Sequence, residues 1–179
     1  MKPKYISNRS KVYSNEYQEI FHYFANFGDY SKEYFVLEAG TRAGMVVIQD
    51  NCILLVKQYR FLINRASLEI PGGKVEPQET PENAAIRECL EETGLRCRNP
   101  DLLLTYHPGL DTTSNPTYLY HCNEIEYSYE PDAIHREEVL GHEWVPLEKC
   151  LEMIFSGEIL DAFSIISLLA YQSQKERLQ

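Results

Sequence analysis

The stretch from Gly73 to Leu95 constrains the fold more than any other, because it contains signals for both ends of a helix. Thr80 is a favoured N-cap residue, and Pro81 suits the first helical position, where a backbone N–H has no partner within the helix. Gly94 is the residue type that most often ends a helix. We therefore predict a helix over residues 81–93, preceded by the glycine-containing loop Pro71–Lys74.

Glutamates crowd one face of this predicted helix. Arg87 is the only basic residue between Val75 and Leu95. The glutamates in the same stretch are Glu76, Glu79, Glu82, Glu88, Glu91 and Glu92. At about 100° per residue, the last three share an arc of about 100°. The opposite side is predicted to face the core and carries Ile86, Cys89, Leu90 and Thr93.

Crowded carboxylates need compensation. Two of them about 6 Å apart repel by roughly 3 kcal/mol at an effective dielectric of 20. One arginine is too little for three carboxylates, whereas a hard divalent cation such as Mg²⁺ takes oxygen ligands. Glycines in the preceding loop let the backbone approach a ligand, so a carbonyl there can also bind the cation. The alternative is a solvated acidic face on which Glu91 pairs with Arg87.

The rest of the chain predicts layers of strands and helices. Asp50-Asn51 separates two apolar runs and indicates a hairpin. The predicted strands are 45–49, 52–56, 68–70, 102–106, 118–122 and 143–145. Two further helices are predicted over 147–155 and 160–172, the second with its core face formed by Phe163, Ile166, Leu169 and Ala170. This order indicates an α+β protein and not a repeating βαβ unit.

Residues 1–40 differ in composition from the rest of the chain, because they contain many Tyr and Phe side chains. Residues 27–31 read as a turn between two extended aromatic runs, which predicts an antiparallel β arm. Aromatic residues on strands usually serve packing. The other interpretations are a partner interface or stacking on a base.

Composition narrows the classes of function. With 17 basic and 27 acidic residues the formal charge is −10, so a nucleic-acid polymer is a poor ligand. The five cysteines are scattered, with no zinc-site spacing, and are expected to be reduced thiols of a cytoplasmic protein. No apolar run approaches the roughly 20 residues that cross a bilayer, and no signal sequence is expected.

The segment Gly73–Leu95 resembles the Nudix box, G-x5-E-x7-R-E-U-x-E-E-x-G-U with U apolar. The fixed positions are matched by Gly73, Glu79, Arg87-Glu88, Glu91-Glu92 and Gly94, and the apolar positions by Cys89 and Leu95. The resemblance implies a hydrolase that cleaves a nucleoside diphosphate linked to another group. It also implies an α/β/α sandwich around a mixed β-sheet, here with the N-terminal β arm of residues 1–40 ahead of a Nudix domain over 41–179.

The resemblance assigns roles position by position. It implies Mg²⁺, or Mn²⁺ in its place, as the cofactor. The implied metal ligands are Glu88, Glu92, Glu91 in an assisting role, and the Gly72 carbonyl. Arg87 and Glu79 would orient these carboxylates through hydrogen bonds.

The flanks of the box resemble the ADP-ribose pyrophosphatase branch. Val56–Arg60 is similar to its V-x-Q-Y-R run, Leu68–Lys74 to its L-E-(L/I)-P-(A/G)-G-K run, and His107–Gly109 to its downstream proline-glycine element, here slightly nearer the box. The resemblance implies that Arg60 contacts a substrate phosphate, Glu69 a sugar or base edge, and that Pro108 lies at the substrate. The alternatives are a structural ion pair for Arg60 and a solvent-facing strand position for Glu69.

The branch implies hydrolysis of ADP-ribose or a related ADP-sugar to AMP and a sugar phosphate. The alternatives are another nucleotide sugar such as GDP-mannose, or a non-catalytic nucleotide-sugar sensor. A general base is expected from a late acidic loop, with Glu137 and Glu138 as the best match. Branch members commonly pair through the N-terminal region, so a homodimer is expected, with a small-molecule substrate, no nucleic-acid polymer and no membrane as partners.

Overall fold

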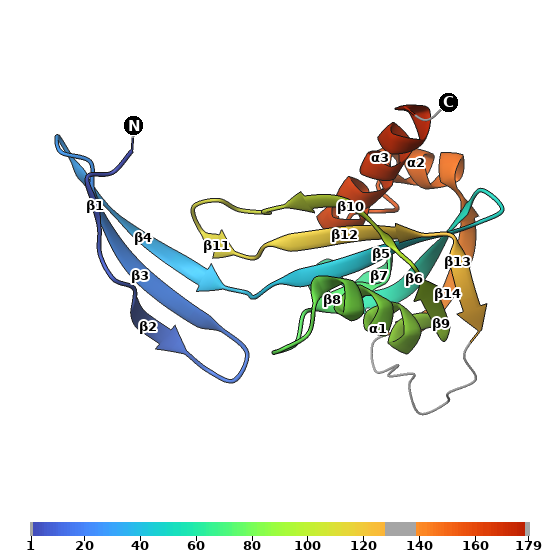
Figure 1. Cartoon of the computed structure of the whole chain (residues 1–179), viewed down its shortest axis with the longest axis horizontal. Helices are drawn as coiled ribbons and strands as arrows, with labels where there is room; N and C mark the ends of the chain where they lie inside the picture. The colour runs from blue at the N-terminus through green and yellow to red at the C-terminus, as the bar shows by residue number, and fades with distance from the viewer. Residues whose placement is uncertain (1, 128–138, 178–179) are drawn as a thin grey trace. The chain divides into compact units, whose positions relative to one another are not determined.

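The computed structural model describes residues 2–127 and 139–177 (Figure 1). The chain divides into two compact units. The N-terminal unit comprises the residues up to Thr41 together with Tyr106–Thr117. The larger unit, called the α+β unit below, comprises Arg42–Thr105 and the residues from Tyr118 onward.

A seven-stranded sheet forms the centre of the α+β unit. Its main strand order is β10-β12-β5-β6-β14, with β7 paired to β6 and β8 paired to β5. The strands are β5 (Arg42–Gln49), β6 (Cys52–Arg60), β7 (Arg65–Glu69), β8 (Gly72–Lys74), β10 (Asp101–Tyr106), β12 (Thr117–Cys122) and β14 (Val139–Pro146). A separate antiparallel pair consists of β9 (Leu95–Arg98) and β13 (Glu124–Tyr127).

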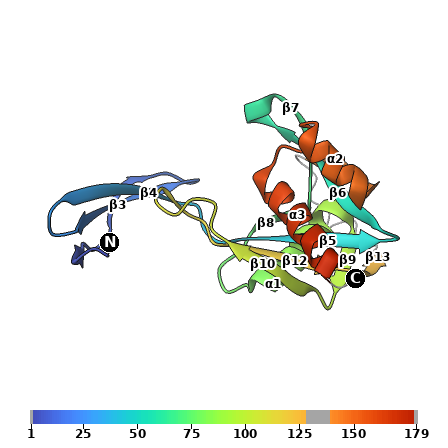
Figure 2. The ribbon, with the colours of Figure 1, turned by 90° about the horizontal axis from the view of Figure 1, so that it is seen from above.

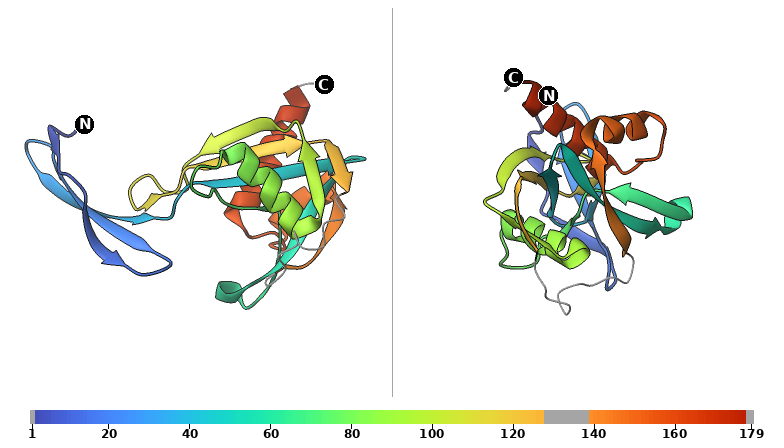
Figure 3. Two further views of the ribbon diagram at one scale, coloured as in Figure 1. Left: turned by 60° about the horizontal axis from the view of Figure 1, so that its bottom comes forward. Right: turned by 90° about the vertical axis from the view of Figure 1, so that its right-hand side faces the viewer.

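Helices cover both faces of this sheet. α1 (Pro81–Thr93) lies on one face, in front of the sheet in the left view of Figure 3. α2 (Leu147–Phe155) and α3 (Ala162–Arg177) lie on the other, the face seen in Figure 2. A short 3₁₀ turn, η1 (Phe61–Ile63), joins β6 to β7. The α+β class and the α/β/α layering predicted from the sequence are confirmed.

The predicted hairpin and helix ends are confirmed in detail. Asp50 and Asn51 both have positive φ, 50° and 62°, as the tight turn between β5 and β6 requires. The Thr80 hydroxyl accepts the Asn83 N–H at 3.2 Å and caps α1. Gly94 ends that helix at φ 76°.

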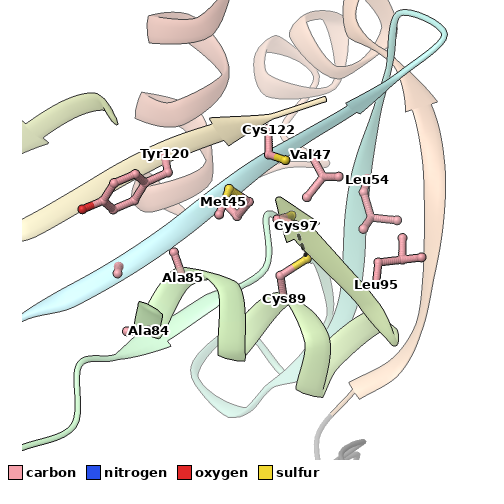
Figure 4. Packing of buried hydrophobic residues seen from close by; sticks show 11 residues of the cluster. Met45, Val47, Leu54, Ala84, Ala85, Cys89, Leu95, Cys97, Tyr120 and Cys122 are labelled. Carbon is pink, nitrogen blue, oxygen red and sulfur yellow. Dashed lines mark hydrogen bonds between the residues drawn. The ribbon is translucent and has the colours of Figure 1, made fainter. Parts of the chain in front are cut away.

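The core between α1 and the sheet holds the apolar face of α1 (Figure 4). Ala84, Ala85 and Cys89 of α1 are fully buried. They belong to one cluster with Ala43, Met45, Val47, Leu54, Leu95, Cys97, Tyr120 and Cys122. The Cys97 thiol lies 3.7 Å from that of Cys89, and all five cysteines are free. Cys89 therefore fills its apolar position in the motif as a small hydrophobe.

The predicted core face of α3 is wrong at Leu169, which is 43% exposed. The fully buried side chains of α3 are Ser164, Ser167 and Leu168. Both serines satisfy their hydroxyl groups within the protein, Ser167 by donating to the Phe163 carbonyl at 2.7 Å. Their burial therefore costs little, and the helix turns a different face inward than its apolar pattern suggested.

The N-terminal unit is a five-stranded sheet. Its strands are β1 (Tyr5–Ile6), β2 (Ser10–Ser14), β3 (Glu19–Asn26), β4 (Ser31–Glu38) and β11 (Thr113–Ser114). β3 and β4 pair antiparallel around the predicted turn, in which Gly28 has φ 102°, and β11 runs parallel to β4. Large apolar side chains remain exposed on the strands of this sheet, namely Tyr5, Ile6, Val12, Tyr13 and Phe35.

Within the described residues, no helix is both long and apolar enough to span a membrane.

Candidate active site

The acidic helix and the glycine loop meet on one side of the α+β unit. Gly72 and Gly73 belong to β8, which pairs with Ala43 and Gly44 of β5. The Met45 N–H donates to the Pro71 carbonyl at 3.0 Å, so β5 also holds the residue ahead of β8. The loop is thereby fixed beside the C-terminal half of α1. The regular pitch of the helix places residues 88, 91 and 92 next to one another there.

Glu92 is the most deeply buried of the helix carboxylates, with 8% of the residue exposed. Its Oε2 accepts the Gly72 N–H at 3.0 Å, and its Oε1 accepts a hydrogen bond from the Gln58 amide. Burial raises the pKa of Glu92 to about 7, against the lowering effect of the Gly72 bond, and the nearby Glu88 charge adds to the rise. Glu92 is thus held inside the protein, where the sequence predicted an outward-facing carboxylate.

Glu88 lies directly against the loop. A Cβ on Gly73 would come within 2.3–2.7 Å of the Glu88 carboxyl group, so only glycine leaves room for it there. Burial raises the pKa of Glu88, while the Arg87 guanidinium opposes that shift. The side chain is 17% exposed, so its carboxylate is only partly solvated.

Four carboxylates, those of Glu79, Glu88, Glu91 and Glu92, form what is called the acidic cluster below. Arg87 connects the first three of them. Its guanidinium donates to Glu79 at 3.0 and 3.1 Å, to Glu88 at 2.9 Å and to Glu91 at 3.0 Å. It also donates to the Lys74 carbonyl at 3.0 Å, which ties the helix to the end of β8. The Arg87 contact holds the pKa of Glu79 below its usual range, and Glu79 in turn raises the pKa of Arg87. The Glu91–Arg87 pair of the alternative interpretation is present, but the same guanidinium also serves Glu79 and Glu88.

The donor chemistry of this cluster fits a hard divalent cation. Three of the four carboxylates share the Arg87 guanidinium, and Glu92 receives hydrogen bonds from the neutral Gln58 amide and the Gly72 N–H. The groups are all oxygen donors, as Mg²⁺ requires, and Gly73 leaves space where a side chain would displace Glu88. As they stand, no three His, Cys, Asp or Glu side chains of the described residues already surround one point.

Arg60 and Glu69 are brought together at the β6–β7 pair. The Arg60 Nε donates to Glu69 at 2.8 Å, and a second, shorter bond joins Nη2 to the other carboxylate oxygen. Glu69 is 5% exposed, so it does not face solvent as the alternative interpretation supposed. The Arg60 charge also lowers the pKa of Glu92, which indicates that this pair is electrically coupled to the acidic cluster.

Three other predicted site residues are not part of the described α+β unit. Pro108 belongs to the N-terminal unit. Glu137 and Glu138 lie outside the described residues.

Gln58 was missed as a functional residue by the sequence analysis. It lies in β6 two residues beyond Val56, on a strand whose preceding residues are almost all buried, and is itself 7% exposed. A buried polar side chain needs a hydrogen-bond partner. In the structure the partner of the Gln58 amide is Glu92. Arg42 was also missed; its charge lowers the pKa of Glu88.

Several known proteins are similar to this chain in sequence or in fold. The family model of the NUDIX domain matches residues 39–163, which include every described residue of the acidic cluster. The chain is 30% identical over 152 residues to the ADP-ribose pyrophosphatase of Bacillus subtilis, covering 85% of this chain and 82% of the relative. It is 33% identical over 145 residues to the CMP-5'-(N-acetyl-N-hydroxy-3-aminopropyl)phosphonate hydrolase of Streptomyces rubellomurinus, covering 80% and 68%.

A solved structure described as an ADP compounds hydrolase has a similar fold, with a TM-score of 0.84. The match covers 99% of this chain and 96% of that chain at 18% sequence identity, so it bears on the fold alone.

Proposed function

Because this chain belongs to the Nudix family of hydrolases, we propose that it hydrolyses the pyrophosphate bond of ADP-ribose or a related ADP-sugar. The products are AMP and a sugar phosphate. The observation that carries the proposal is the meeting of the Glu88 and Glu92 carboxylates with the Gly72–Gly73 loop. The similarity to an ADP-ribose pyrophosphatase over most of both chains supports the choice of substrate.

Glu88, Glu92, Glu91 and the Gly72 carbonyl are the groups that would hold Mg²⁺ or Mn²⁺. When bound, the cation neutralises phosphate charge and lowers the pKa of a coordinated water. Arg87 keeps the carboxylates of the helix at fixed positions through its bonds to Glu88 and Glu91, and Glu79 holds the guanidinium itself. The Gly72 N–H fixes one oxygen of Glu92.

A hydrolysis screen tests the proposal. ADP-ribose, GDP-mannose, UDP-glucose, NADH, dinucleoside polyphosphates and a CMP-linked phosphonate are incubated with and without Mg²⁺, and the products are separated by chromatography. The CMP compound is included because of the Streptomyces relative. We expect ADP-ribose to be cleaved fastest and only with the cation present. Faster cleavage of another substrate would reassign the specificity, and no turnover of any of them would favour the non-catalytic sensor.

The acidic cluster is tested with matched glutamates of one helix. Glu92→Gln removes the charge of a proposed ligand, whereas Glu82→Gln changes an exposed glutamate in the first turn of α1, outside the cluster. We expect Glu92→Gln to lower kcat at least 100-fold and Glu82→Gln to leave it within twofold. Equal activity of the two variants would remove Glu92 from the site.

Arg60 is proposed to contact a substrate phosphate while Glu69 fixes its guanidinium through two bonds. Arg60→Ala is therefore expected to raise KM at least tenfold. Arg65→Ala is the matched control, because Arg65 lies opposite Arg60 in the β6–β7 register and donates to the Gly157 carbonyl instead. Unchanged KM and kcat in Arg60→Ala would make Arg60 a structural residue.

Glu137 and Glu138 remain the proposed source of the general base, which accepts the proton of the attacking water. Glu137→Gln and Glu138→Gln are measured separately across pH. A loss of the acidic limb of the pH–rate profile in one of them would identify the base. If both retain full activity, the base lies elsewhere.

The N-terminal unit is proposed to mediate a homodimer, because its sheet exposes several large apolar side chains. A solution mass twice the 20.8 kDa of one chain is expected. Phe35→Glu places a charge at a 56% exposed position of β4 and should halve that mass, whereas Ser173→Glu on exposed α3 surface should not. A monomeric wild type would end this proposal. The cytoplasmic location stays a prediction from the sequence.

A further inference from the structure

Ser164 of α3 connects that helix to Ile70, the residue just before the loop Pro71–Lys74. Its side chain is fully buried. Its hydroxyl donates to the Asp161 carboxylate at 2.8 Å and accepts the Ile70 N–H at 3.0 Å. Asp161 also accepts the Ser164 N–H at 2.8 Å and so caps the start of α3. Because the Ser164 hydroxyl hydrogen is directed at Asp161, a lone pair of its oxygen accepts the Ile70 N–H.

Three successive residues, Ile70, Pro71 and Gly72, are held by three different elements. Ile70 is held by Ser164 of α3, Pro71 by the Met45 N–H of β5, and Gly72 by the Glu92 carboxylate of α1. The main chain that carries a proposed metal ligand thus receives one bond from each layer of the sandwich. Removing the Ser164 hydroxyl takes this hydrogen-bond acceptor away from the Ile70 N–H, two residues before Gly72.

Phe163, the neighbour of Ser164, supports the same loop by packing. A Cβ on Gly44 would come within 2.2 Å of the Phe163 ring, and one on Gly72 would come within 3.0 Å. The ring therefore occupies space that exists because both of these residues are glycines. Its centroid also lies 5.7 Å from the guanidinium carbon of Arg42, whose charge lowers the pKa of Glu88.

We propose that Phe163 and Ser164 are positioning residues of the active site. From the side of the sheet opposite α1, Phe163 packs against Gly72 and Ser164 hydrogen-bonds Ile70. The Gly72 carbonyl and the Glu92 carboxylate are thereby held in one arrangement. This inference rests on the proposed role of Gly72 and Glu92 as metal ligands. Groups that orient metal ligands typically change metal affinity 10- to 100-fold when they are removed.

Ser164→Ala tests the inference, and Ser167→Ala is its matched control. Both serines are fully buried on α3, but the Ser167 hydroxyl bonds the Phe163 carbonyl of its own helix. The nucleotide-free full chain is titrated with Mn²⁺, and free Mn²⁺ is followed by electron paramagnetic resonance. We expect the Mn²⁺ dissociation constant to rise at least tenfold in Ser164→Ala and to stay within twofold in Ser167→Ala.

Two further measurements separate positioning from a loss of stability. Amide hydrogen exchange should accelerate at Ile70 and Gly72 in Ser164→Ala while exchange in the core of α1 stays slow. In turnover assays at limiting Mg²⁺ the variant should lose activity, and raised Mg²⁺ should restore it with KM for the nucleotide sugar unchanged. If Ser164→Ala does not fold, Phe163→Leu, which empties the space over Gly44 and Gly72, should raise the Mn²⁺ dissociation constant in the same way.

The outcomes distinguish this inference from the proposed function. Tight Mn²⁺ binding by the wild type with equal dissociation constants in Ser164→Ala and Ser167→Ala would overturn the positioning role and leave the metal site standing. Absence of Mn²⁺ binding by the wild type would overturn both.

Discussion

Replacing Glu92 by glutamine should stabilise the metal-free protein, and increasingly so as the pH rises. Burial raises the pKa of Glu92 from 4.5 to about 7. Between these values the native protein keeps a proton on Glu92 that the unfolded chain releases. The native state therefore binds more protons, and the free energy of unfolding falls as the pH rises through this window.

The magnitude follows from the size of the shift. A rise from 4.5 to about 7 corresponds to about 3 kcal/mol once the pH exceeds both values. Part of it is already lost at pH 5, so about 2.5 kcal/mol should be lost between pH 5 and pH 8. A glutamine at this position carries no charge, and it can accept the Gly72 N–H while Gln58 turns its amide to receive the new NH₂ group.

The assay is urea unfolding in EDTA at pH 5 and pH 8, on the wild type, Glu92→Gln and Glu82→Gln. Comparing variants cancels other titrating groups, such as His121, whose pKa burial lowers. The advantage of Glu92→Gln over the wild type should grow by about 2.5 kcal/mol, while Glu82→Gln shows no such trend. A constant difference would mean that Glu92 is already ionised at pH 5, and the argument from burial would fail. Mg²⁺ at 100 times its dissociation constant should restore about 2.7 kcal/mol to the wild type.

Three further substitutions test the neighbouring contacts. Arg87→Met breaks the contacts to three carboxylates. It should lower kcat/KM 10- to 100-fold in an AMP-release assay. A smaller loss would show that the carboxylates keep their positions without the guanidinium. Gly73→Ala forces the Glu88 carboxyl group away from the loop, so Mn²⁺ affinity should fall at least tenfold with the circular dichroism spectrum unchanged, and unaltered affinity would remove Glu88 from the metal site. Thr80→Ala loses the α1 cap and should cost about 1 kcal/mol in urea unfolding with kcat unchanged; a changed kcat would show that the helix start influences the site.

The elements around the site were predictable because their boundaries depend on local chemistry. The cap at Thr80, the glycine at 94 and the Asp50-Asn51 turn each act within a few residues, and each lies where the sequence predicted it. The acidic cluster was predictable for a similar reason, since the spacing of Glu88, Glu91 and Glu92 on a helix follows from its pitch alone.

The partners of these groups could not be predicted, because they come from distant parts of the chain. Gln58 is 34 residues from Glu92, and Ser164 is 94 residues from Ile70. Hydrophobic periodicity assigned Leu169 to the core and left Ser164 out, since it counts a serine as polar whether or not its hydroxyl finds partners. The structure reverses this assignment because two hydrogen bonds satisfy the buried Ser164 hydroxyl.

The repulsion expected within the acidic cluster is resolved unevenly, and that unevenness indicates where a cation acts most strongly. Arg87 bonds Glu79, Glu88 and Glu91, and its contact with Glu79 holds the pKa of that carboxyl below its usual range. Glu92 receives its hydrogen bonds from an amide and a backbone N–H, which satisfy its oxygens without neutralising its charge, and its pKa is raised. The two opposite shifts distinguish Glu79, where the Arg87 contact outweighs burial, from Glu92, where burial outweighs the hydrogen bonds. A cation placed at Glu92 would therefore relieve a cost that the fold leaves standing, whereas at Glu79 it would compete with an ion pair that is already formed.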